Sequence, residues 1–429
     1  MLLDTWQKTT LNFRIYAYMQ KFMKEYRLPA EEVRKIQFTR LKKLLCDVYQ
    51  IYPFYRERFD GCQFNPFKMA DLSDFKKVPI LEKEDYRAFI KSQLEQDEKR
   101  YQNWYEDTTS GSTGIPLRIL RNWDERAYML AKWMRALFLN GYNWRDVTFS
   151  MPAPNHLQRD SVVQRFGLLK RYHVPFTDPV ENKVDKYLKV NPSVVYANKT
   201  HLVQIALYCE KNKIKLPKPH LCISIAETMD ERSRAVIGKC FGAESLMEAY
   251  GALEFSIIAW QTKGEDYFNI CHTTDYLEVL DENGHDTNHG SCIITDLFIG
   301  SFPMIRYKLG DILNTEIKDG LPVIKKIIGR QDDAIIFADG EHMPWHIFAV
   351  ILERQQEIKQ FRVIQEDYDK IRIQVAKEPD ADRLAVENAI ITDLRQEVRD
   401  KDIEYIVDFV DHIPPDPNGK LRLLISKVN

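Results

Sequence analysis

A run of hydroxyl residues and glycines lies near residue 110 of the chain. It consists of Thr108-Thr109-Ser110-Gly111-Ser112-Thr113-Gly114, with Pro116 two residues after its last glycine. Such a segment buries little apolar surface, so packing does not explain its composition. Glycine lets the backbone approach a ligand closely, and hydroxyl groups with free amides form a concavity that suits phosphate oxygens. The run is therefore a candidate phosphate-binding loop, although an exposed Ser/Thr/Gly turn has the same composition.

Other charged and aromatic side chains that could take part in chemistry are spread over the rest of the chain. They are Tyr250 and Gly251 with Glu254, then Asp311, then Arg330 with Asp332, and finally Lys420 after Gly419. A carboxylate is a hard oxygen ligand for Mg²⁺, and arginine and lysine donate hydrogen bonds to phosphate oxygens. Each residue also has an ordinary structural alternative, such as a core aromatic for Tyr250 or an exposed turn lysine for Lys420.

The elements that must position these residues alternate between strand and helix. Residues 147–151, 193–197 and 222–225 are β-branched or apolar runs of strand length, and residues 201–212 have helical spacing. Strand–helix–strand alternation predicts a largely parallel sheet, whose ligands collect at the carboxyl ends of the strands. Ala226 and Glu227 follow one predicted strand directly, and the segment from Tyr250 to Glu254 also lies at a predicted strand end. The fold class is therefore predicted to be α/β.

Helices and a second β region flank this pattern. Helices are predicted over residues 36–53, 79–100 and 124–139, and Asn283-Gly284 predicts a hairpin turn within residues 276–294. A small β-subdomain is expected from there to residue 311. Beyond Gly329 the pattern restarts with strands at 335–337, 361–364, 371–375 and 405–407 and a helix over 386–398. We therefore expect an N-terminal domain of residues 1–330 and a small α+β C-terminal domain of residues 331–429.

The order of these segments resembles that of the core motifs of adenylate-forming enzymes. The matching segments are Thr109–Gly114 with Pro116, Tyr250-Gly251-x-x-Glu254, Arg306-Tyr307-x-x-Gly310-Asp311, Gly329-Arg330-x-Asp332 and Gly419-Lys420. Within that superfamily the chain resembles the phenylacetate–CoA ligase branch, which includes proteins of the capsular-polysaccharide-biosynthesis type. Residues 52–56, 78–81 and 302–307 also resemble segments of that branch. The resemblance extends from about residue 35 to 425, and its strength comes from the order and spacing of the motifs together.

The resemblance implies roles for residues of the N-terminal domain. Thr109, Ser110, Gly111, Ser112, Thr113 and Gly114 would bind the phosphates of ATP, and Glu254 would hold Mg²⁺. Tyr250 and Gly251 would lie against adenine, where Ala226 and Glu227 would line the pocket. Asp311 would accept hydrogen bonds from both ribose hydroxyls, and Arg330 would reach ribose or phosphate.

The resemblance also implies a mobile C-terminal domain that carries the catalytic lysine. Lys420 would neutralise charge between the carboxylate and the α-phosphate during adenylation, together with Glu254 and Arg330. The domain would rotate about Asp332 between the two half-reactions. This scheme implies activation of a carboxylic acid as an acyl-adenylate, followed by transfer of the acyl group to coenzyme A.

Two positions depart from the family pattern. Ile115-Pro116-Leu117 follows the phosphate loop where many relatives have a lysine, although Pro116 is usual in this branch. Leu253 occupies the place of a hydroxyl residue whose oxygen meets the α-phosphate. The loss of one such hydrogen bond costs on the order of 1–3 kcal/mol of transition-state stabilisation. A nucleotide-binding partner protein with little turnover is therefore an alternative to a ligase.

Composition excludes several other classes of function. Lys+Arg 61 against Asp+Glu 63 gives a net charge of -2, with no basic tail for nucleic acid. Charged residues interrupt the N-terminus, and no apolar run reaches the length of a membrane span, so neither a signal peptide nor a membrane partner is expected. The seven cysteines are scattered and lack a Cys-x-x-Cys pair, which favours reduced thiols in the cytoplasm. Cys271, His272, His285, His289 and Cys292 fit no common zinc-finger spacing.

The sequence thus predicts an ATP- and Mg²⁺-dependent enzyme, an adenylate-forming acid–thiol ligase that uses coenzyme A. An aryl or arylacetic acid is favoured by the resemblance alone. A close alternative transfers the acyl group to an amine or to the thiol of a carrier protein. Dimers are common among the relatives, so a homodimer is a further expectation. The sequence does not identify the acid.

Overall fold

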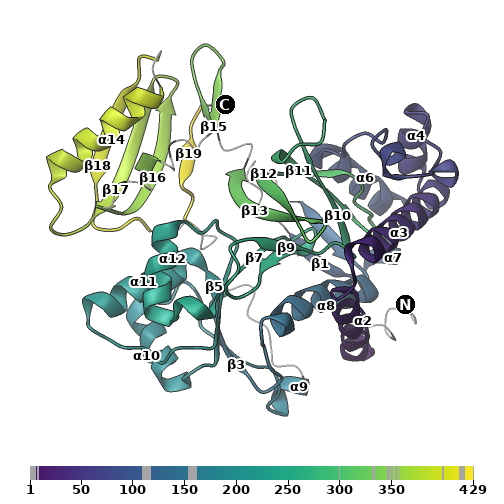
Figure 1. Ribbon diagram of the computed structural model, residues 1–429, viewed down its shortest axis with the longest axis horizontal. Helices are drawn as coiled ribbons and strands as arrows, with labels where there is room; N and C mark the ends of the chain where they lie inside the picture. Colours follow the sequence, from purple (N-terminus) through teal and green to yellow (C-terminus); the bar gives the residue numbers. More distant parts are fainter. Residues whose placement is uncertain are drawn as a thin grey trace. The chain divides into compact units, whose positions relative to one another are not determined.

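The computed structural model of the chain is shown in Figure 1. It describes residues 6, 9–108, 117–152, 162–298, 300–330, 334–344, 348, 351–352, 355, 357–398, 401–414 and 421–428. Contacts divide the chain into two units, Met1–Trp144 with Met247–Ile327 and Arg145–Leu246 with Ile328–Asn429. The division into domains at residue 330 stays a prediction. The fold class is α/β, as the sequence predicts.

The helices of the first unit form its N-terminal part. They are α2 (Leu11–Glu25), α3 (Ala30–Ile51), α4 (Pro53–Gly61), α5 (Leu72–Phe75), α6 (Lys83–Gln96), α7 (Glu98–Tyr101) and α8 (Trp123–Leu139), with a short 3-10 turn η1 (Pro66–Lys68). Helix α3 buries Leu41, Leu44, Leu45 and Val48 at helical spacing, and it ends where Pro53 begins α4. Helix α8 begins with a capping box between Asn122 and Glu125.

The strands of the first unit form a mainly antiparallel sheet. They are β7 (Leu246–Ala252), β8 (Ser256–Gln261), β9 (Phe268–Ile270), β10 (Asp275–Leu280), β11 (His289–Asp296), β12 (Tyr307–Lys318) and β13 (Leu321–Arg330), in the spatial order β10-β11-β12-β13-β9-β8-β7. Strands β10 and β11 pair antiparallel on either side of Asn283-Gly284, which confirms the predicted hairpin. A separate hairpin joins β1 (Tyr105–Thr108) to β2 (Arg118–Arg121).

The second unit contains the parallel strands that the alternating pattern predicts. They are β3 (Val147–Ser150), β4 (Lys170–His173), β5 (Val194–Asn198) and β6 (Leu221–Ile225), in the order β6-β5-β3-β4. Helices α9 (Val162–Arg165), α10 (Val180–Val190), α11 (Lys199–Lys211) and α12 (Glu231–Phe241) connect or follow them, and a 3-10 turn η3 (Ala243–Ser245) follows α12. Phe149, Val195 and Cys222 pack against Leu202 and Ile237 in a common core. This core fixes the carboxyl ends of the strands.

The C-terminal residues of the second unit form a small α+β fold, a four-stranded sheet with a helix on one face. Strands β16 (Ile358–Asp367), β17 (Lys370–Lys377), β18 (Glu404–Phe409) and β19 (Leu424–Ser426) lie in the order β18-β17-β16-β19, beside the short pair β14 (Ala334–Ile336) and β15 (His342–Pro344). Helix α14 (Arg383–Glu397) covers one face of this sheet (Figure 1). It buries Val386, Ile390 and Leu394 there, as their four-residue spacing predicts.

Candidate functional site

The β1–β2 hairpin carries the candidate phosphate-binding loop. Thr108, the last residue of β1, pairs with Arg118, the first residue of β2. The loop itself, Thr109, Ser110, Gly111, Ser112, Thr113 and Gly114, lies outside the described residues. Leu117, which follows it, is buried in the core of the first unit. The candidate loop therefore lies in the chain between two paired strands, β1 and β2.

The motif Tyr250-Gly251-x-x-Glu254 forms the end of β7 and the turn into β8. A register shift separates the pairs Tyr250–Ala259 and Gly251–Ile257, so the ladder is bulged at Gly251. A Cβ at Gly251 would overlap the carbonyl oxygen of Ser256, which explains why glycine stands there. Ser256 itself adopts a left-handed backbone with φ 60°. The turn that carries Glu254 is therefore tightly constrained on the β8 side.

Two buried cations hold the backbone carbonyls of this turn. Arg121 Nη2 donates to the carbonyl oxygens of Leu253 and Glu254, both at 2.7 Å. Lys132 Nζ donates to the carbonyl oxygen of Phe255 at 2.9 Å and to Asp275 at 2.8 Å. The side chain of Leu253 packs against the hydrophobic core, so the residue that replaces the family's hydroxyl serves packing. Sequence reasoning missed Arg121 and Lys132, because nothing in their local sequence distinguishes them.

The carboxylate of Glu254 is available for a metal ion. It is partly exposed, and the described residues include no hydrogen-bond or ion-pair partner for it. A half-exposed carboxylate on a fixed turn has the charge and the oxygen donors that Mg²⁺ prefers. Glu254 therefore fits the metal role that the family resemblance implies.

Tyr250 and Asp311 meet in the structure. The Tyr250 hydroxyl donates to Asp311 Oδ2 at 2.6 Å, and both residues are 9% exposed. Tyr250 comes from β7 and Asp311 from β12. The structure thus brings together the residues expected to contact adenine and ribose, and their short hydrogen bond fixes both side chains.

The Arg306-Tyr307 part of the same motif has a structural role. Arg306 adopts φ 49° and forms a buried ion pair with Glu278 at 3.0 Å. Its Nη1 also donates to the carbonyl oxygens of Lys76 and Val78, at 2.8 and 2.5 Å. Burial raises the pKa of the Glu278 carboxyl, and the Arg306 charge opposes that shift. Arg306 therefore anchors the segment of residues 76–81 to the start of β12.

The segments that carry the resemblance to the phenylacetate–CoA ligase branch pack against one another. The hydroxyls of Tyr52, Tyr55 and Tyr86 donate to the carbonyl oxygens of Ser301, Pro303 and Phe302, respectively. These aromatic side chains are buried, so the cluster at residues 52–55 belongs to the core and does not form a ligand wall. The segment that leads into β12 is fixed by these tyrosines.

In the second unit, Ala226 and Glu227 follow β6 at the carboxyl end of the parallel strands. Ala226 has a left-handed backbone with φ 66°, a conformation that is uncommon for residues other than glycine. Glu227 accepts hydrogen bonds from the Thr200 amide at 2.7 Å and the Thr200 hydroxyl at 3.0 Å. The amide of Leu421 also donates to Glu227, at 3.3 Å. The residue after Lys420 is thus bonded to the segment expected to line the nucleotide pocket.

The remaining predicted site residues are Arg330, Asp332 and Lys420. Arg330 ends β13 with an exposed side chain. Asp332 and Lys420 lie outside the described residues. Among the residues that are described, no three His, Cys, Asp or Glu side chains gather into a group that could hold a metal ion. The seven cysteines are free thiols, and Cys271 and Cys292 are buried.

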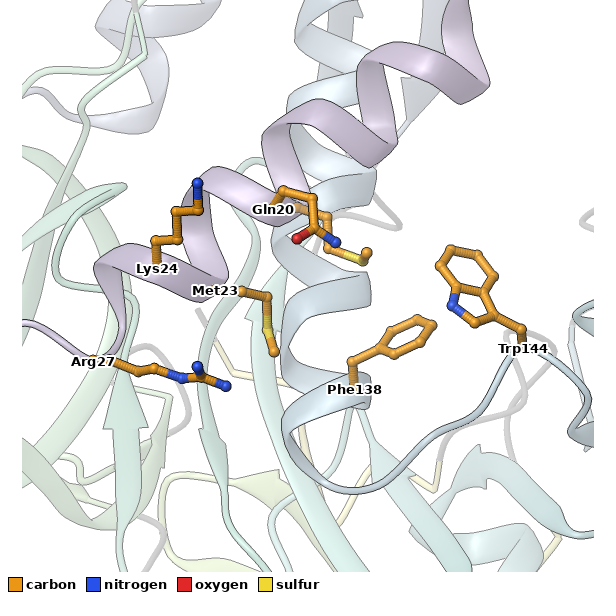
Figure 2. A pocket seen from close by; sticks show the side chains of 7 residues that line it. Gln20, Met23, Lys24, Arg27, Phe138 and Trp144 are labelled. Carbon is orange, nitrogen blue, oxygen red and sulfur yellow. The ribbon is translucent and has the colours of Figure 1, made fainter.

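A pocket of about 280 Å³ lies in the first unit, away from these motifs in sequence (Figure 2). It is lined by Met19, Gln20, Met23, Lys24, Arg27, Phe138 and Trp144. Phe138 and Trp144 face each other there, with ring centroids 4.7 Å apart. None of its residues is one that the sequence predicts for the nucleotide. None of the helices in the described part of the chain combines the length and apolar character that a membrane span requires.

Comparisons with known proteins agree with the motif order. The family model of the CapK C-terminal domain matches residues 338–427. The protein CapK of Staphylococcus aureus is 26% identical over 61% of this chain, and the match spans 58% of that protein's length. The phenylacetate-coenzyme A ligase of Pseudomonas putida is 24% identical over 78% of each chain. A crystal structure of 2-hydroxyisobutyryl-CoA ligase in the postadenylation state has the same fold, with a TM-score of 0.73 at 18% identity over 94% of this chain and 91% of that one.

The fold is the one found in this adenylate-forming ligase, and the curated relatives include phenylacetate–CoA ligases. Within that superfamily the chain is similar to CapK and to the phenylacetate–CoA ligases, and the CapK C-terminal domain is the family model that matches its residues 338–427.

Proposed function

We propose that this chain activates a carboxylic acid as an acyl-adenylate, with ATP and Mg²⁺, and then transfers the acyl group to coenzyme A. The observation that carries the proposal is the buried hydrogen bond between Tyr250 and Asp311. Two residues of separate motifs that meet in one place are what a shared role in nucleoside binding requires. The phenylacetate-coenzyme A ligases that the chain resembles over most of its length support the choice of acceptor.

In the first half-reaction a carboxylate oxygen of the acid bonds to the α-phosphorus of ATP, and the bond to pyrophosphate breaks. Such a reaction depends on positioning and on stabilisation of phosphoryl charge. We expect residues 109–114 to bind phosphate oxygens through backbone amides. Asp311 accepts hydrogen bonds from the ribose hydroxyls, and Tyr250 lies against adenine. Bound at Glu254, Mg²⁺ would neutralise phosphate charge.

The remaining predicted residues supply positive charge and movement. Lys420 and Arg330 contribute cations that stabilise the developing charge on the phosphate and the acid. The bond from Leu421 to Glu227 supports this role, because it ties the residue next to Lys420 to the Ala226–Glu227 segment. In the second half-reaction the thiolate of coenzyme A attacks the acyl carbon and AMP leaves. Asp332 is the proposed hinge for the domain movement between the two half-reactions.

An aryl or arylacetic acid is the proposed substrate, by resemblance to the phenylacetate–CoA ligases. Pyrophosphate–ATP exchange with a panel of arylacetic, aryl and short aliphatic acids tests both the reaction and the acid. Wild type should exchange with at least one acid. Lys420→Ala should exchange about 10²-fold more slowly, since it removes a charge that acts on the transition state. Lys427→Ala is the matched control, because Lys427 is an exposed lysine of the same terminal segment, 3.9 Å from Glu366.

Acceptors are then compared under the conditions that support exchange. Formation of a thioester and AMP only when coenzyme A is present supports the ligase. An amide formed from an added amine, or acylation of a carrier protein without coenzyme A, would assign a different acceptor. Nucleotide binding without exchange on any acid would instead indicate a protein with little turnover. In that case Leu253→Thr, which restores the hydroxyl, should raise the exchange rate.

A further inference from the structure

Three consecutive carbonyl groups at the β7–β8 turn are bound by two buried cations. Arg121 binds the carbonyls of Leu253 and Glu254, and Lys132 binds that of Phe255. Hydrogen bonds from a charged donor are about twice as strong as those between neutral groups. The turn that carries the Glu254 carboxylate is therefore held from its backbone, while the side chain itself stays available.

Arg121 makes this contact from a confined position. The residue is only 5% exposed, and a single terminal nitrogen, Nη2, reaches both carbonyl oxygens at 2.7 Å. A buried guanidinium is costly unless its donors are used, so the two carbonyl groups are a substantial part of what stabilises it there. A shift of the turn by about 1 Å would lengthen both bonds beyond hydrogen-bonding distance.

The same residue belongs to the hairpin that carries the candidate phosphate loop. Strand β2 begins at Arg118, which pairs with Thr108 beside the loop, and it ends at Arg121, which pairs with Tyr105. Three residues of extended strand separate the two arginines by roughly 10 Å. Arg121 thus connects the base of the hairpin to the Glu254 turn, and no other strand pairing joins β1 or β2 to another strand among the described residues.

Lys132 provides a second fixed point from α8. It is fully buried, and its ion pair with Asp275 joins α8 to β10. The Ser256 hydroxyl also donates to the carbonyl of Met129 in α8, at 3.2 Å. The turn is therefore held against α8 at its β8 end, and Arg121 binds it to the β1–β2 hairpin.

We propose that Arg121 is a positioning residue that fixes the turn carrying the Glu254 carboxylate relative to the β1–β2 hairpin, whose strands flank the candidate phosphate-binding residues in the sequence. The inference rests on the proposed function of Glu254 and the loop, and it goes beyond it by giving a role to a residue outside the family motifs. If two parts of one nucleotide site are set by this contact, its loss should weaken metal-dependent nucleotide binding without changing affinity for the acid.

The test compares Arg121→Met, Arg121→Lys and the matched control Arg118→Met. Arg118 lies on the same strand, is exposed and pairs with Glu106, so its loss leaves the turn in place. Circular dichroism and thermal unfolding establish that each variant is folded. Exchange rate, KM for the acid and the Mg²⁺ concentration for half-maximal exchange are then measured. A fluorescent ATP analogue is titrated with and without Mg²⁺, which gives a readout that does not require turnover.

Arg121→Met should lower kcat for exchange by about 10²-fold and raise the half-saturating Mg²⁺ at least about fivefold, with KM for the acid changed by less than about twofold. Arg121→Lys, which keeps a charged donor, should lie between wild type and Arg121→Met. Arg118→Met should match wild type. If Arg121→Met does not fold, Arg121→Lys decides the question, because its half-saturating Mg²⁺ must still exceed that of wild type.

The results separate failure of the positioning role from failure of the proposed function. If wild type exchanges with no acid but Arg121→Met weakens binding of the ATP analogue only when Mg²⁺ is present, the reaction is wrong and the positioning role holds. If the Arg121 and Arg118 variants have the same Mg²⁺ dependence in both assays, the positioning role is overturned. A loss of exchange with unchanged Mg²⁺ dependence would also overturn it, since Arg121 would then affect the rate without affecting the metal-binding carboxylate.

Discussion

Substitution of Gly251 by alanine should disturb the turn that carries Glu254 with the smallest possible change in side chain. A Cβ at this position would overlap the carbonyl oxygen of Ser256 and would lie 3.1 Å from its carbonyl carbon and 3.2 Å from Ile257 Cα. All three atoms belong to the backbone of the β8 side of the hairpin, so no flexible side chain can move aside. The strands must separate by on the order of 1 Å before the atoms reach normal contact distance.

The magnitude follows from that displacement. Overpacking of this kind costs about 1–3 kcal/mol of folding free energy. A misplacement of about 1 Å in a catalytic group can lower the rate by about 10²-fold. We therefore expect Gly251→Ala to unfold at lower urea concentration and to lose about two orders of magnitude in pyrophosphate–ATP exchange. The loss of exchange should exceed the loss of folded protein, because the displaced segment lies between Tyr250 and Glu254.

The assay combines urea unfolding, followed by tryptophan fluorescence, with exchange measured on the folded fraction. Gly61→Ala is the matched control. Gly61 is the last residue of α4, and a Cβ there has no atom within 4 Å. It should leave both stability and exchange unchanged within about 0.5 kcal/mol and twofold. The reasoning is refuted if Gly251→Ala unfolds together with wild type and exchanges at a similar rate, since the hairpin would then tolerate the extra carbon.

Two other perturbations follow from single contacts. Asp311→Asn should raise KM for ATP by about 10–100-fold, because a hydrogen bond to a charged group contributes about 1.5–3 kcal/mol. The ATP dependence of exchange measures this, and a KM within about twofold of wild type would remove Asp311 from nucleotide binding. Stability should fall in mild acid, because burial lowers the pKa of His272 from its ordinary value of 6.5 to about 4. The Nε2 of His272 hydrogen-bonds the Pro322 carbonyl at 2.8 Å. A group whose pKa is lower in the folded state stabilises it above the unfolded pKa, so up to about 3 kcal/mol should be lost as the pH falls from 6.5 towards 4. Urea unfolding at several pH values should show this loss in wild type and a weaker one in His272→Gln; equal pH dependence in the two proteins would contradict the assignment.

Local sequence patterns predicted a helix or strand well where its burial leaves a regular pattern of apolar residues. The apolar residues of α3 and α14 repeat at helical spacing because each helix packs one side on a core. The runs that became β3, β5 and β6 are short and apolar because parallel strands are covered on both faces. Asn283-Gly284 predicted a hairpin because both residues accept the backbone that a tight turn requires. These signals are local, so one sequence carries them without knowledge of the fold.

Other features depend on contacts between residues far apart in the chain. Arg121 and Lys132 have the sequence surroundings of ordinary strand-end and helix residues, and only folding brings them to the carbonyls of residues 253–255. An aromatic cluster at a helix end, such as Tyr52 and Tyr55, favours a place in the core, and the bonds of these tyrosines to Ser301 and Pro303 show which segment they pack against. The role of Leu253 likewise became apparent from the core against which it packs.

The sequence by itself showed the resemblance to adenylate-forming enzymes, because the order and spacing of five motifs can be recognised where overall identity is low. The roles predicted for residues that would bind ribose and Mg²⁺ came from that resemblance, and they stay predictions. Only the tertiary structure decided that Tyr250 bonds Asp311 and that Leu421 bonds Glu227. The physical reason is that such hydrogen bonds need two groups within about 3 Å, and that proximity is set by the packing of whole elements.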